Sequence, residues 1–355
     1  MKVVIRVDAS VQIGIGHVMR CLTLAATLRR DGADVIFISR AHTGNLIKFI
    51  QEKGFKTFIL KGVEDLSSSE NTLQHSEWLG VSQQKDAEQC RLVLEEVRAD
   101  WLIVDHYSID QFWEDSLKGF YKKLMVIDDL ADRNHVCDIL LDQTFGRSRE
   151  DYLNLVPKRS KLLMGARYAL LRPEFEQWRD YSLKRRLNQK VKRILIAMGG
   201  VDSDNITEQV LCSIQNSNLR NDIEIIVVMG GTAPHLNAVK EQANRMSFKT
   251  DVVVNVSNMA EIISNSDLGI GAAGATTWER CCLGLPSIMF VLAQNQRKIA
   301  SLVAEEGAAI IVDKVDMDNL YLSICLAENQ LASLTSRASN ISDGQGVGRV
   351  LGQII

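Results

Sequence analysis

Short apolar runs alternate with amphipathic helical patterns along the chain, and this alternation constrains the fold more than any other feature of the sequence. The run at 2–7 leads through a turn with two glycines into a helical pattern that Gly32 is placed to end, and a strand-like run at 34–40 follows. Runs that are apolar at every position suit parallel strands with both faces covered by helices. The pattern therefore predicts an α/β fold with doubly wound parallel sheets. Further buried strands are predicted at 101–107, 123–130 and 139–144.

The alternation is interrupted once, by a charged stretch at 172–193 with little apolar content. It restarts with the strand-like run at 193–200, and both halves of the chain begin with a strand that enters a glycine-rich turn. A chain of 355 residues is long enough for two domains of ordinary size. We therefore predict two α/β domains, over 1–172 and 191–355, joined by a linker helix over 173–190.

Composition and charge exclude several classes of protein. The chain is 46% apolar and 24% charged, which is typical of a globular protein, and its net charge of -3 gives no reason to expect nucleic acid or an anionic membrane as a partner. No apolar run is long enough to span a membrane, and Arg6 and Asp8 interrupt the only segment that could act as a signal peptide. Seven scattered cysteines without metal-type spacing indicate reduced thiols. These features predict a cytoplasmic protein.

The stretch SVQIGIGHVMR places a histidine at the start of the first predicted helix. It is a poor dinucleotide-binding loop, because a third glycine is missing and the second strand ends in Arg40 where an acidic residue is expected. Gly14 and Gly16 still allow the backbone to come close to a phosphate or a sugar. The helix N-terminus disfavours the cationic form of His17, so this side chain can stay neutral and accept a proton. The alternative is a loop histidine with only a structural role.

A second glycine-rich helix start occurs in IGAAGATTWERCCLGLP. Its small residues let free backbone N–H groups approach a phosphate. Thr276 and Thr277 can cap the helix or bond the phosphate, and the Glu279 carboxylate can accept hydrogen bonds from two ribose hydroxyls. The alternative is equally consistent with the residues, because the helix dipole favours an acid in the first turn and glycine–alanine runs also serve close packing.

A D-x-D sequence at 202–204 matches the metal-binding motif of one class of glycosyltransferase. It directly precedes a helix that begins with Asn205 and Glu208 at the spacing of a capping box. Turn and cap carboxylates explain the motif better, so no metal is predicted. Gly199 and Gly200 are expected to face the ligand with their backbone.

Polar residues also end two of the predicted strands. If the strands are parallel, these residues lie at the same sheet edge as His17, and one of them can orient His17 or a sugar hydroxyl. Carboxylates at strand ends also commonly cap the next helix, which is the alternative for each. The residues concerned are Asp105, His106, Asp128 and Asp129. Four other histidines, His42, His75, His135 and His235, show no ligand spacing and are assigned no role.

With these stretches in view, the chain resembles the family of UDP-2,4-diacetamido-2,4,6-trideoxy-β-L-altropyranose hydrolases of pseudaminic acid biosynthesis. The matching motifs are spread in the expected order over nearly the whole chain. They are RVDASVQIGIGHVMRCLTLA, VDHY, VIDDLADRNHVCDILLDQT, LLMGARYALLRPEF, AMGGVDSDN and AAGATTWERCCLGLPSI. A weaker similarity, at the level of the fold, links the chain to the N-acetylglucosaminyl transferase of peptidoglycan synthesis.

The resemblance implies a GT-B architecture, in which two Rossmann-like domains flank a cleft and the C-terminal domain holds most of the UDP. It implies that His17 is the catalytic base, that Glu279 binds the ribose and that Gly274 lies in the diphosphate loop. The similarity to the transferase implies that Val256 presents backbone groups to uracil. The expected substrate-binding residues are Arg6, Asp8, Gly14, Gly16, Asp105, Tyr107, Gly199, Gly200, Val256, Ala273, Gly274, Ala275, Thr276, Glu279, Asn295 and Gln296.

Two positions depart from the family pattern. Ala275 stands where a hydroxyl residue is expected in the phosphate loop, and Ala166 replaces an expected proline. No cofactor, no metal and no fused acetyltransferase activity are expected.

The predicted reaction is hydrolysis of a UDP-sugar by a single displacement with inversion at the anomeric carbon, in a pathway that serves flagellin glycosylation. His17 removes a proton from the attacking water, and UDP leaves. We expect a monomer whose only partners are the UDP-sugar and water. One alternative is a glycosyltransferase of the same fold, for which the stretch at 46–60 could supply an apolar patch, although this stretch equally resembles a helix and a strand. The other is a nucleotide-sugar-binding protein without activity.

Overall fold

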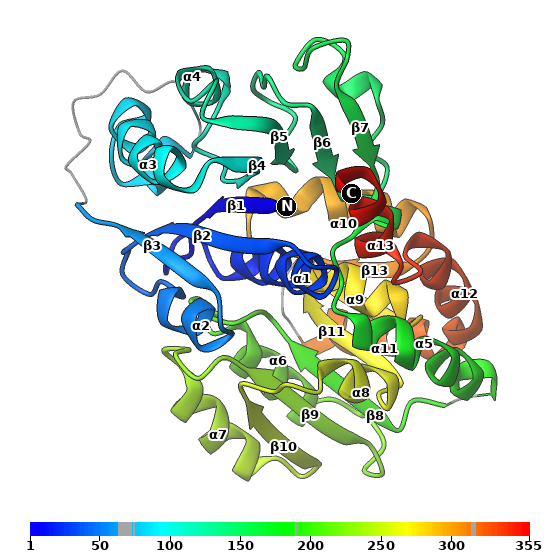
Figure 1. Cartoon of the computed structure of the whole chain (residues 1–355). Helices are drawn as coiled ribbons and strands as arrows, with labels where there is room; N and C mark the ends of the chain where they lie inside the picture. The colour runs from blue at the N-terminus through cyan, green and yellow to red at the C-terminus, as the bar shows by residue number, and fades with distance from the viewer. Residues whose placement is uncertain (63–72, 74, 189, 314–316) are drawn as a thin grey trace. The chain divides into compact units, whose positions relative to one another are not determined.

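The computed structural model describes residues 1–62, 73, 75–188, 190–313 and 317–355. The chain divides into two compact units (Figure 1): unit 1 consists of Met1–Leu170 and Val347–Ile355, and unit 2 of Leu171–Gly346. Each unit is a parallel sheet with helices on its faces, so the predicted α/β fold is confirmed.

The sheet of unit 1 has seven parallel strands in the order β3-β2-β1-β4-β5-β6-β7. The order reverses beside β1, so β1 and β4 are neighbours whose outgoing loops separate at their carboxyl ends. Such a switch point is where doubly wound sheets bind ligands. The strands are β1 Lys2–Val7, β2 Asp34–Arg40, β3 Lys56–Leu60, β4 Ala99–Asp105, β5 Tyr121–Ile127, β6 Ile139–Asp142 and β7 Lys161–Met164.

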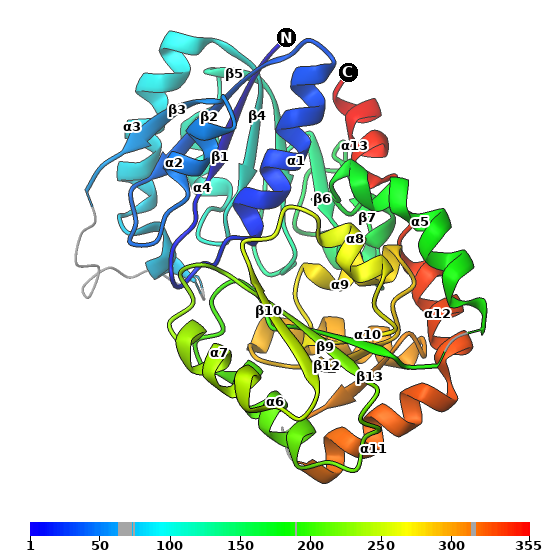
Figure 2. The same ribbon diagram turned by 90° about the horizontal axis from the view of Figure 1, so that it is seen from below.

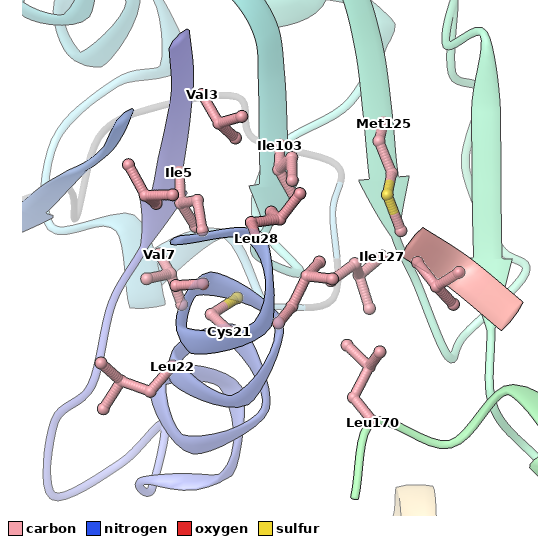
Figure 3. Packing of buried hydrophobic residues seen from close by; sticks show 14 of the residues in the cluster. Val3, Ile5, Val7, Cys21, Leu22, Leu28, Ile103, Met125, Ile127 and Leu170 are labelled. Carbon is pink, nitrogen blue, oxygen red and sulfur yellow. The ribbon is translucent and has the colours of Figure 1, made fainter. Parts of the chain in front are cut away.

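Helices cover both faces of this sheet. Val3, Ile5 and Val7 of β1 pack against Cys21, Leu22 and Leu28 of α1 on one face (Figure 3), while Val4 belongs to a second apolar cluster with α3 and α4 on the other. This alternation along β1 is what a buried strand between two helix layers requires. The helices of unit 1 are α1 Gly16–Arg30, α2 Ile47–Glu52, α3 Gln83–Val97, α4 Gln111–Ser116, α13 Gly346–Ile354 and the 3₁₀ turns η1 Ser76–Leu79, η2 Glu150–Tyr152 and η3 Ala166–Tyr168.

Unit 2 repeats this topology with six parallel strands in the order β10-β9-β8-β11-β12-β13. Its switch point lies between β8 and β11. The strands are β8 Arg193–Ala197, β9 Glu224–Met229, β10 Lys249–Val254, β11 Leu268–Ala272, β12 Ser287–Phe290 and β13 Ala309–Val312. The helices are α5 Pro173–Arg185, α6 Ile206–Gln215, α7 Leu236–Arg245, α8 Met259–Ser264, α9 Thr276–Cys282, α10 Arg297–Glu305, α11 Met317–Asn329, α12 Leu331–Ile341 and the turns η4 Arg186–Asn188 and η5 Gln294–Gln296.

The segment expected to be a linker helix is an integral part of unit 2. Helix α5 ends near the buried side chain of Arg186, which donates hydrogen bonds to the carbonyl oxygens of Ile263, Ser266 and Leu283 at 2.8, 2.6 and 3.1 Å. The buried Ser182 hydroxyl donates to the Leu283 carbonyl as well, at 2.7 Å. These bonds fix α5 to the ends of α8 and α9, so low apolar content at 172–193 does not indicate a free connector.

Residues 347–355 also differ from the expected domain 191–355, because they belong to unit 1. Val347, Val350, Leu351 and Ile354 of α13 are buried in the same apolar cluster as α1 and β1. Both ribbon views show α13 beside β7 (Figure 2), and the Arg349 side chain donates to the Arg167 carbonyl at 2.8 Å. Packing of the apolar face of α13 on α1 and β1 therefore places this helix in unit 1.

Three smaller expectations have clear outcomes. The stretch at 46–60 contains α2 and β3, a helix and a strand. All seven cysteines lie among the described residues, and none forms a disulfide. Within the described ranges, no helix is both long and apolar enough to cross a membrane.

Candidate functional site

The loop between β1 and α1 forms one side of the switch point in unit 1. The Ser10 carbonyl accepts a hydrogen bond from the Gly14 N–H at 2.9 Å, and the Ser10 hydroxyl oxygen accepts one from the Ile13 N–H at 2.9 Å. Gly14 has φ +77°, a conformation that side chains rarely adopt. A Cβ at Gly14 or Gly16 would meet no atom within 4 Å, so the backbone of both glycines borders open space.

His17 is the second residue of α1, and its ring contacts the end of β4. The Nδ1 atom lies 2.6 Å from Oδ1 of the fully buried Asp105. Burial acts to raise the pKa of the Asp105 carboxyl, but the positive charge of Arg20 and the hydrogen bonds from Arg20 and His17 hold that pKa below its usual range. An ionised Asp105 only accepts hydrogen bonds, so Nδ1 must carry the proton. In the described part of the chain, Nε2 of His17 has no hydrogen-bond partner, which leaves its lone pair for a ligand or a water.

Arg20 completes this arrangement, although the sequence analysis did not select it. Its Nε and one terminal nitrogen donate to the two oxygens of Asp105 at 2.6 and 2.7 Å, and its other terminal nitrogen donates to Asp129 at 2.5 Å. The spacing of His17 and Arg20 is a signal that was available, because residues three apart lie on the same face of a helix. Arg20 and Asp105 together orient His17.

Tyr107 packs against His17 from the segment after β4. The two rings meet edge-on with their centroids 4.6 Å apart, and the Tyr107 hydroxyl donates to Asp129 at 3.0 Å. Burial raises the pKa of Tyr107 far above its usual range, so this hydroxyl keeps its proton. His75, which was assigned no role, also lies near Tyr107, at a centroid distance of 5.6 Å.

Arg6 and Asp8 do not line the ligand side as expected. Both side chains are fully buried, and they pair with each other at 2.6 and 2.8 Å. Arg6 faces the α3 side of the sheet, where Asp86 accepts two further bonds from it, and the Arg40 guanidinium also binds Asp86 at 2.7 Å. These four charged side chains pair with one another inside unit 1, so Arg6 and Asp8 cannot touch a ligand in this conformation.

Two of the four strand-end candidates lie away from His17. The backbone N–H groups of Leu130 and Ala131 donate to the buried Asp128 carboxylate, which therefore stabilises a turn. His106 accepts a hydrogen bond from the Ser108 N–H at Nδ1, and its Nε2 lies 3.3 Å from Asp8. Asp105 and Asp129 are thus the strand-end carboxylates that belong to the His17 network.

In unit 2, the loop between β11 and α9 carries several of the expected residues. A Cβ at Gly274 would meet only Nε2 of Gln296, at 3.9 Å, so these two expected residues lie together beside open space. Ala275 forms the N-cap position of α9 without a side-chain hydrogen bond. Burial raises the pKa of Glu279 to about 7 against the opposing charges of Arg172 and Arg280. Thr276 is half-buried at the start of the helix.

Ala273 differs from the expectation, because its side chain is fully buried and its N–H donates to the Phe290 carbonyl at 3.0 Å. Gly199 has φ +110° and borders open space, whereas the Gly200 carbonyl faces Gly230, where a Cβ would be 2.1 Å from it. Val256 lies half-buried in the loop after β10. The side chain of Asn295 lies outside the part of the chain that the structure describes.

The D-x-D sequence caps a helix, but not through the predicted capping box. The Asp202 carboxylate accepts hydrogen bonds from the Ile206 and Thr207 N–H groups, both at 3.0 Å. Asn205 makes no capping bond to the backbone, and its amide instead donates to the Glu208 carboxylate. Asp202 thus caps α6, although it lies four residues before Ile206, the first residue whose N–H it binds.

Comparisons with known proteins agree with the fold described above. The chain is 29% identical over 300 residues to an uncharacterised protein of Methanocaldococcus jannaschii, and this match covers 83% of the chain but only 56% of the relative. It is 26% identical over 308 residues to the UDP-2,4-diacetamido-2,4,6-trideoxy-β-L-altropyranose hydrolase of Campylobacter jejuni, covering 86% of the chain and 97% of the relative. Among solved structures, MurG of Acinetobacter baumannii superposes with a TM-score of 0.70 at 16% identity, covering 99% of both chains. Residues 193–343 match the glycosyltransferase family 28 C-terminal domain, and the two parallel-sheet units have the GT-B glycosyltransferase fold.

Proposed function

We propose that this protein hydrolyses a UDP-linked 2,4-diacetamido-2,4,6-trideoxyhexose to the free sugar and UDP. The observation that carries the proposal is the state of His17. Its Nδ1 proton is held by Asp105 at 2.6 Å, so its Nε2 lone pair is ready to accept a proton. The similarity to a hydrolase named for this reaction, along nearly the whole of that relative, supports the choice of substrate.

In this proposal the nucleotide binds at the carboxyl edge of the unit 2 sheet. Val256 follows β10 and Glu279 follows β11, and these strands are three steps apart, roughly 14 Å at the usual strand spacing. The base and the ribose of a nucleoside span less than this distance, so the loops after β10 and β11 must supply the rest. Uracil then contacts the backbone at Val256, the ribose hydroxyls donate to Glu279, and the diphosphate lies over Gly274 beside Gln296.

The reaction is a single displacement. A water oxygen attacks the anomeric carbon while the bond from that carbon to the diphosphate oxygen breaks, and the bonding electron pair leaves with UDP. His17 Nε2 takes a proton from the attacking water, a contribution typically of about 10²–10⁴-fold. Asp105 stabilises the imidazolium that forms, as the orienting carboxylate of a catalytic triad does. Attack from the face opposite UDP inverts the configuration at the anomeric carbon.

A glycosyl transfer is the second candidate, and the match of residues 193–343 to a glycosyltransferase domain favours it. The same His17 nitrogen would then deprotonate an acceptor hydroxyl instead of water. Incubation with the UDP-sugar alone distinguishes the two reactions. Release of UDP without an acceptor supports hydrolysis, release only with an acceptor supports transfer, and binding without release supports a protein without activity.

Hydrolysis in ¹⁸O-water tests the mechanism. We expect the label in the sugar, because the water attacks carbon, and label in UDP would refute attack at the anomeric carbon. Replacement of His17 with Ala should lower turnover by about 10²–10⁴-fold while UDP still binds. Near-normal turnover by a folded His17→Ala variant would exclude His17 as the base.

A further inference from the structure

Unit 2 contains a buried arginine, Arg280, that has no acidic partner. Its residue exposure is 3%, and in the described ranges no carboxylate forms an ion pair with it. Seven arginines are buried, and five of them, all in unit 1, bind a buried carboxylate: Arg6, Arg20, Arg40, Arg133 and Arg147. Burial of an unpaired cation is strongly unfavourable, so its retention calls for a physical reason.

Two glycines of β11 make room for the Arg280 side chain. A Cβ at Gly269 would lie 3.3 Å from its Cδ, and a Cβ at Gly271 would lie 2.6 Å from a terminal nitrogen. Because residues two apart in a strand share a face, these glycines form a channel along β11 toward its carboxyl end. There the guanidinium donates to the Ala272 carbonyl at 2.9 Å and to the Thr277 hydroxyl at 3.4 Å. The loop 273–275 joins these two partners, so the charge lies directly beneath that loop.

The other unpaired arginine of unit 2, Arg186, shows what full compensation looks like. Three backbone carbonyls accept its hydrogen bonds, and two of them, of Ile263 and Ser266, lie at the C-terminal end of α8, where the helix dipole is negative. Arg280 has one carbonyl partner and one long bond to a hydroxyl, and its Nε has none among the described residues. It also lies beside the first turn of α9, where the backbone field is positive. Among the described residues, Arg280 is therefore less well compensated than Arg186.

The neighbouring carboxylate does not balance this charge. Burial raises the pKa of Glu279 to about 7, so this group is only partly ionised near neutral pH. Burial also lowers the pKa of the Arg280 guanidinium. Both directions have the same cause, since burial disfavours the charged form of each side chain.

We infer that Arg280 supplies the positive charge that holds a phosphate group of the ligand over the loop 273–276. The inference rests on the proposed function insofar as the ligand is a nucleoside diphosphate. Arg280 acts from beneath the loop, in surroundings largely shielded from water, where a unit charge is felt several ångströms away. Gly274 borders open space on the ligand side of the same loop. The same charge would stabilise the diphosphate as it leaves.

Binding measurements test this without any assay of hydrolysis. Arg280→Met keeps the length of the side chain and removes its charge, and calorimetry compares the Kd of UDP with that of uridine in wild type and variant. We expect UDP to bind at least about tenfold more weakly to the variant, with uridine changed less than about twofold. Inorganic pyrophosphate is a second probe, which tests the anion site even if the nucleoside is not uridine. An equal loss for UDP and uridine, or unchanged binding of both anions, would overturn the inference.

Two further variants guard against an effect of misfolding. Arg186→Met also removes a buried unpaired arginine from unit 2, and it should lower the unfolding temperature while leaving the ratio of the two Kd values unchanged. Arg280→Lys keeps a charge on a shorter side chain, and it should bind UDP more tightly than Arg280→Met does. If Arg280→Lys and Arg280→Met bind UDP equally, charge is not the reason for the arginine. Failure of the hydrolysis assay alone would leave these binding results intact.

Discussion

Replacement of Asp105 with Asn tests the orientation of His17 with the smallest change of shape. Asp105 accepts bonds from His17 and Arg20 at Oδ1, at 2.6 and 2.7 Å, and from Arg20 Nε at Oδ2, at 2.6 Å. An amide has one oxygen and one NH₂ group, so the NH₂ group must replace either Oδ1 or Oδ2. In either place, this hydrogen-bond donor faces another donor. If the NH₂ group replaces Oδ2, it opposes Arg20 Nε. If it replaces Oδ1, it opposes the Nδ1 proton of His17 and drives that proton to Nε2, which can then no longer act as a base.

The expected loss follows from the share of catalysis that His17 supplies. General-base catalysis contributes about 10²–10⁴-fold, and the equivalent change in a catalytic triad lowers turnover by about 10⁴. Asp105→Asn should therefore lower kcat by about 10²–10⁴-fold and leave the Kd for UDP unchanged. It should also destabilise unit 1 by about 3 kcal/mol, because Arg20 loses half of a buried ion pair. The double variant with His17→Ala should lose little more than either single variant, because the two side chains act as one unit.

The assay is UDP release at saturating substrate, with unfolding in urea measured in parallel. Asp128→Asn is the matched control, since Asp128 is also a buried carboxylate of unit 1 that binds an arginine, at 2.9 Å, but it does not contact His17. It should lose stability without a comparable loss of kcat. A folded Asp105→Asn variant that turns over within about threefold of wild type would show that catalysis does not depend on the negative charge of Asp105.

Three more predictions follow from groups already described. Burial raises the pKa of Glu279 to about 7, so the folded protein loses stability as the pH rises from the unfolded value near 4.5 through 7. Unfolding in urea should therefore show Glu279→Gln to be about 1–3 kcal/mol more stable than wild type at pH 8 and equally stable near pH 4. The same variant should bind UDP more weakly. Arg20→Lys, which cannot keep the contact of Arg20 with both oxygens of Asp105, should lower kcat without changing the Kd for UDP, and an unchanged kcat would show that Arg20 has only a structural role. Asp202→Ala should lower the free energy of unfolding in urea by about 1–2 kcal/mol, because α6 loses its cap. Turnover by the wild-type protein should be the same with and without EDTA, and if EDTA abolishes turnover, the carboxylate binds a metal.

Strand positions could be predicted from the sequence because they depend on local apolar runs. The runs at 2–7 and 34–40 coincide with β1 and β2, and Gly32 and Gly54 follow α1 and α2 in the left-handed conformation that ends a helix. Domain membership could not be predicted in the same way. The apolar face of α13 identifies a helix but not the sheet on which it packs.

Contacts in the candidate site could be predicted where they follow from the ends of neighbouring strands. They were missed where they depend on which side chains pair inside the protein. His17 and Asp105 could be placed at one sheet edge, because parallel strands bring their carboxyl ends together. Arg6 and Asp8 were selected with the resemblance and not by this rule, and a sequence motif alone does not show which charges neutralise each other inside the protein. Arg280 was overlooked for a related reason, since an arginine beside a glutamate in a helix normally indicates a solvated face.

The return of α13 to the first sheet has a consequence for synthesis of the protein. Unit 1 is discontinuous, and unit 2 is in effect an insertion between Leu170 and Val347. The apolar surface of α1 and β1 that α13 covers therefore stays open on the ribosome until unit 2 and residues 347–354 have been translated. Unit 2 is made as one continuous piece and can complete its own sheet first.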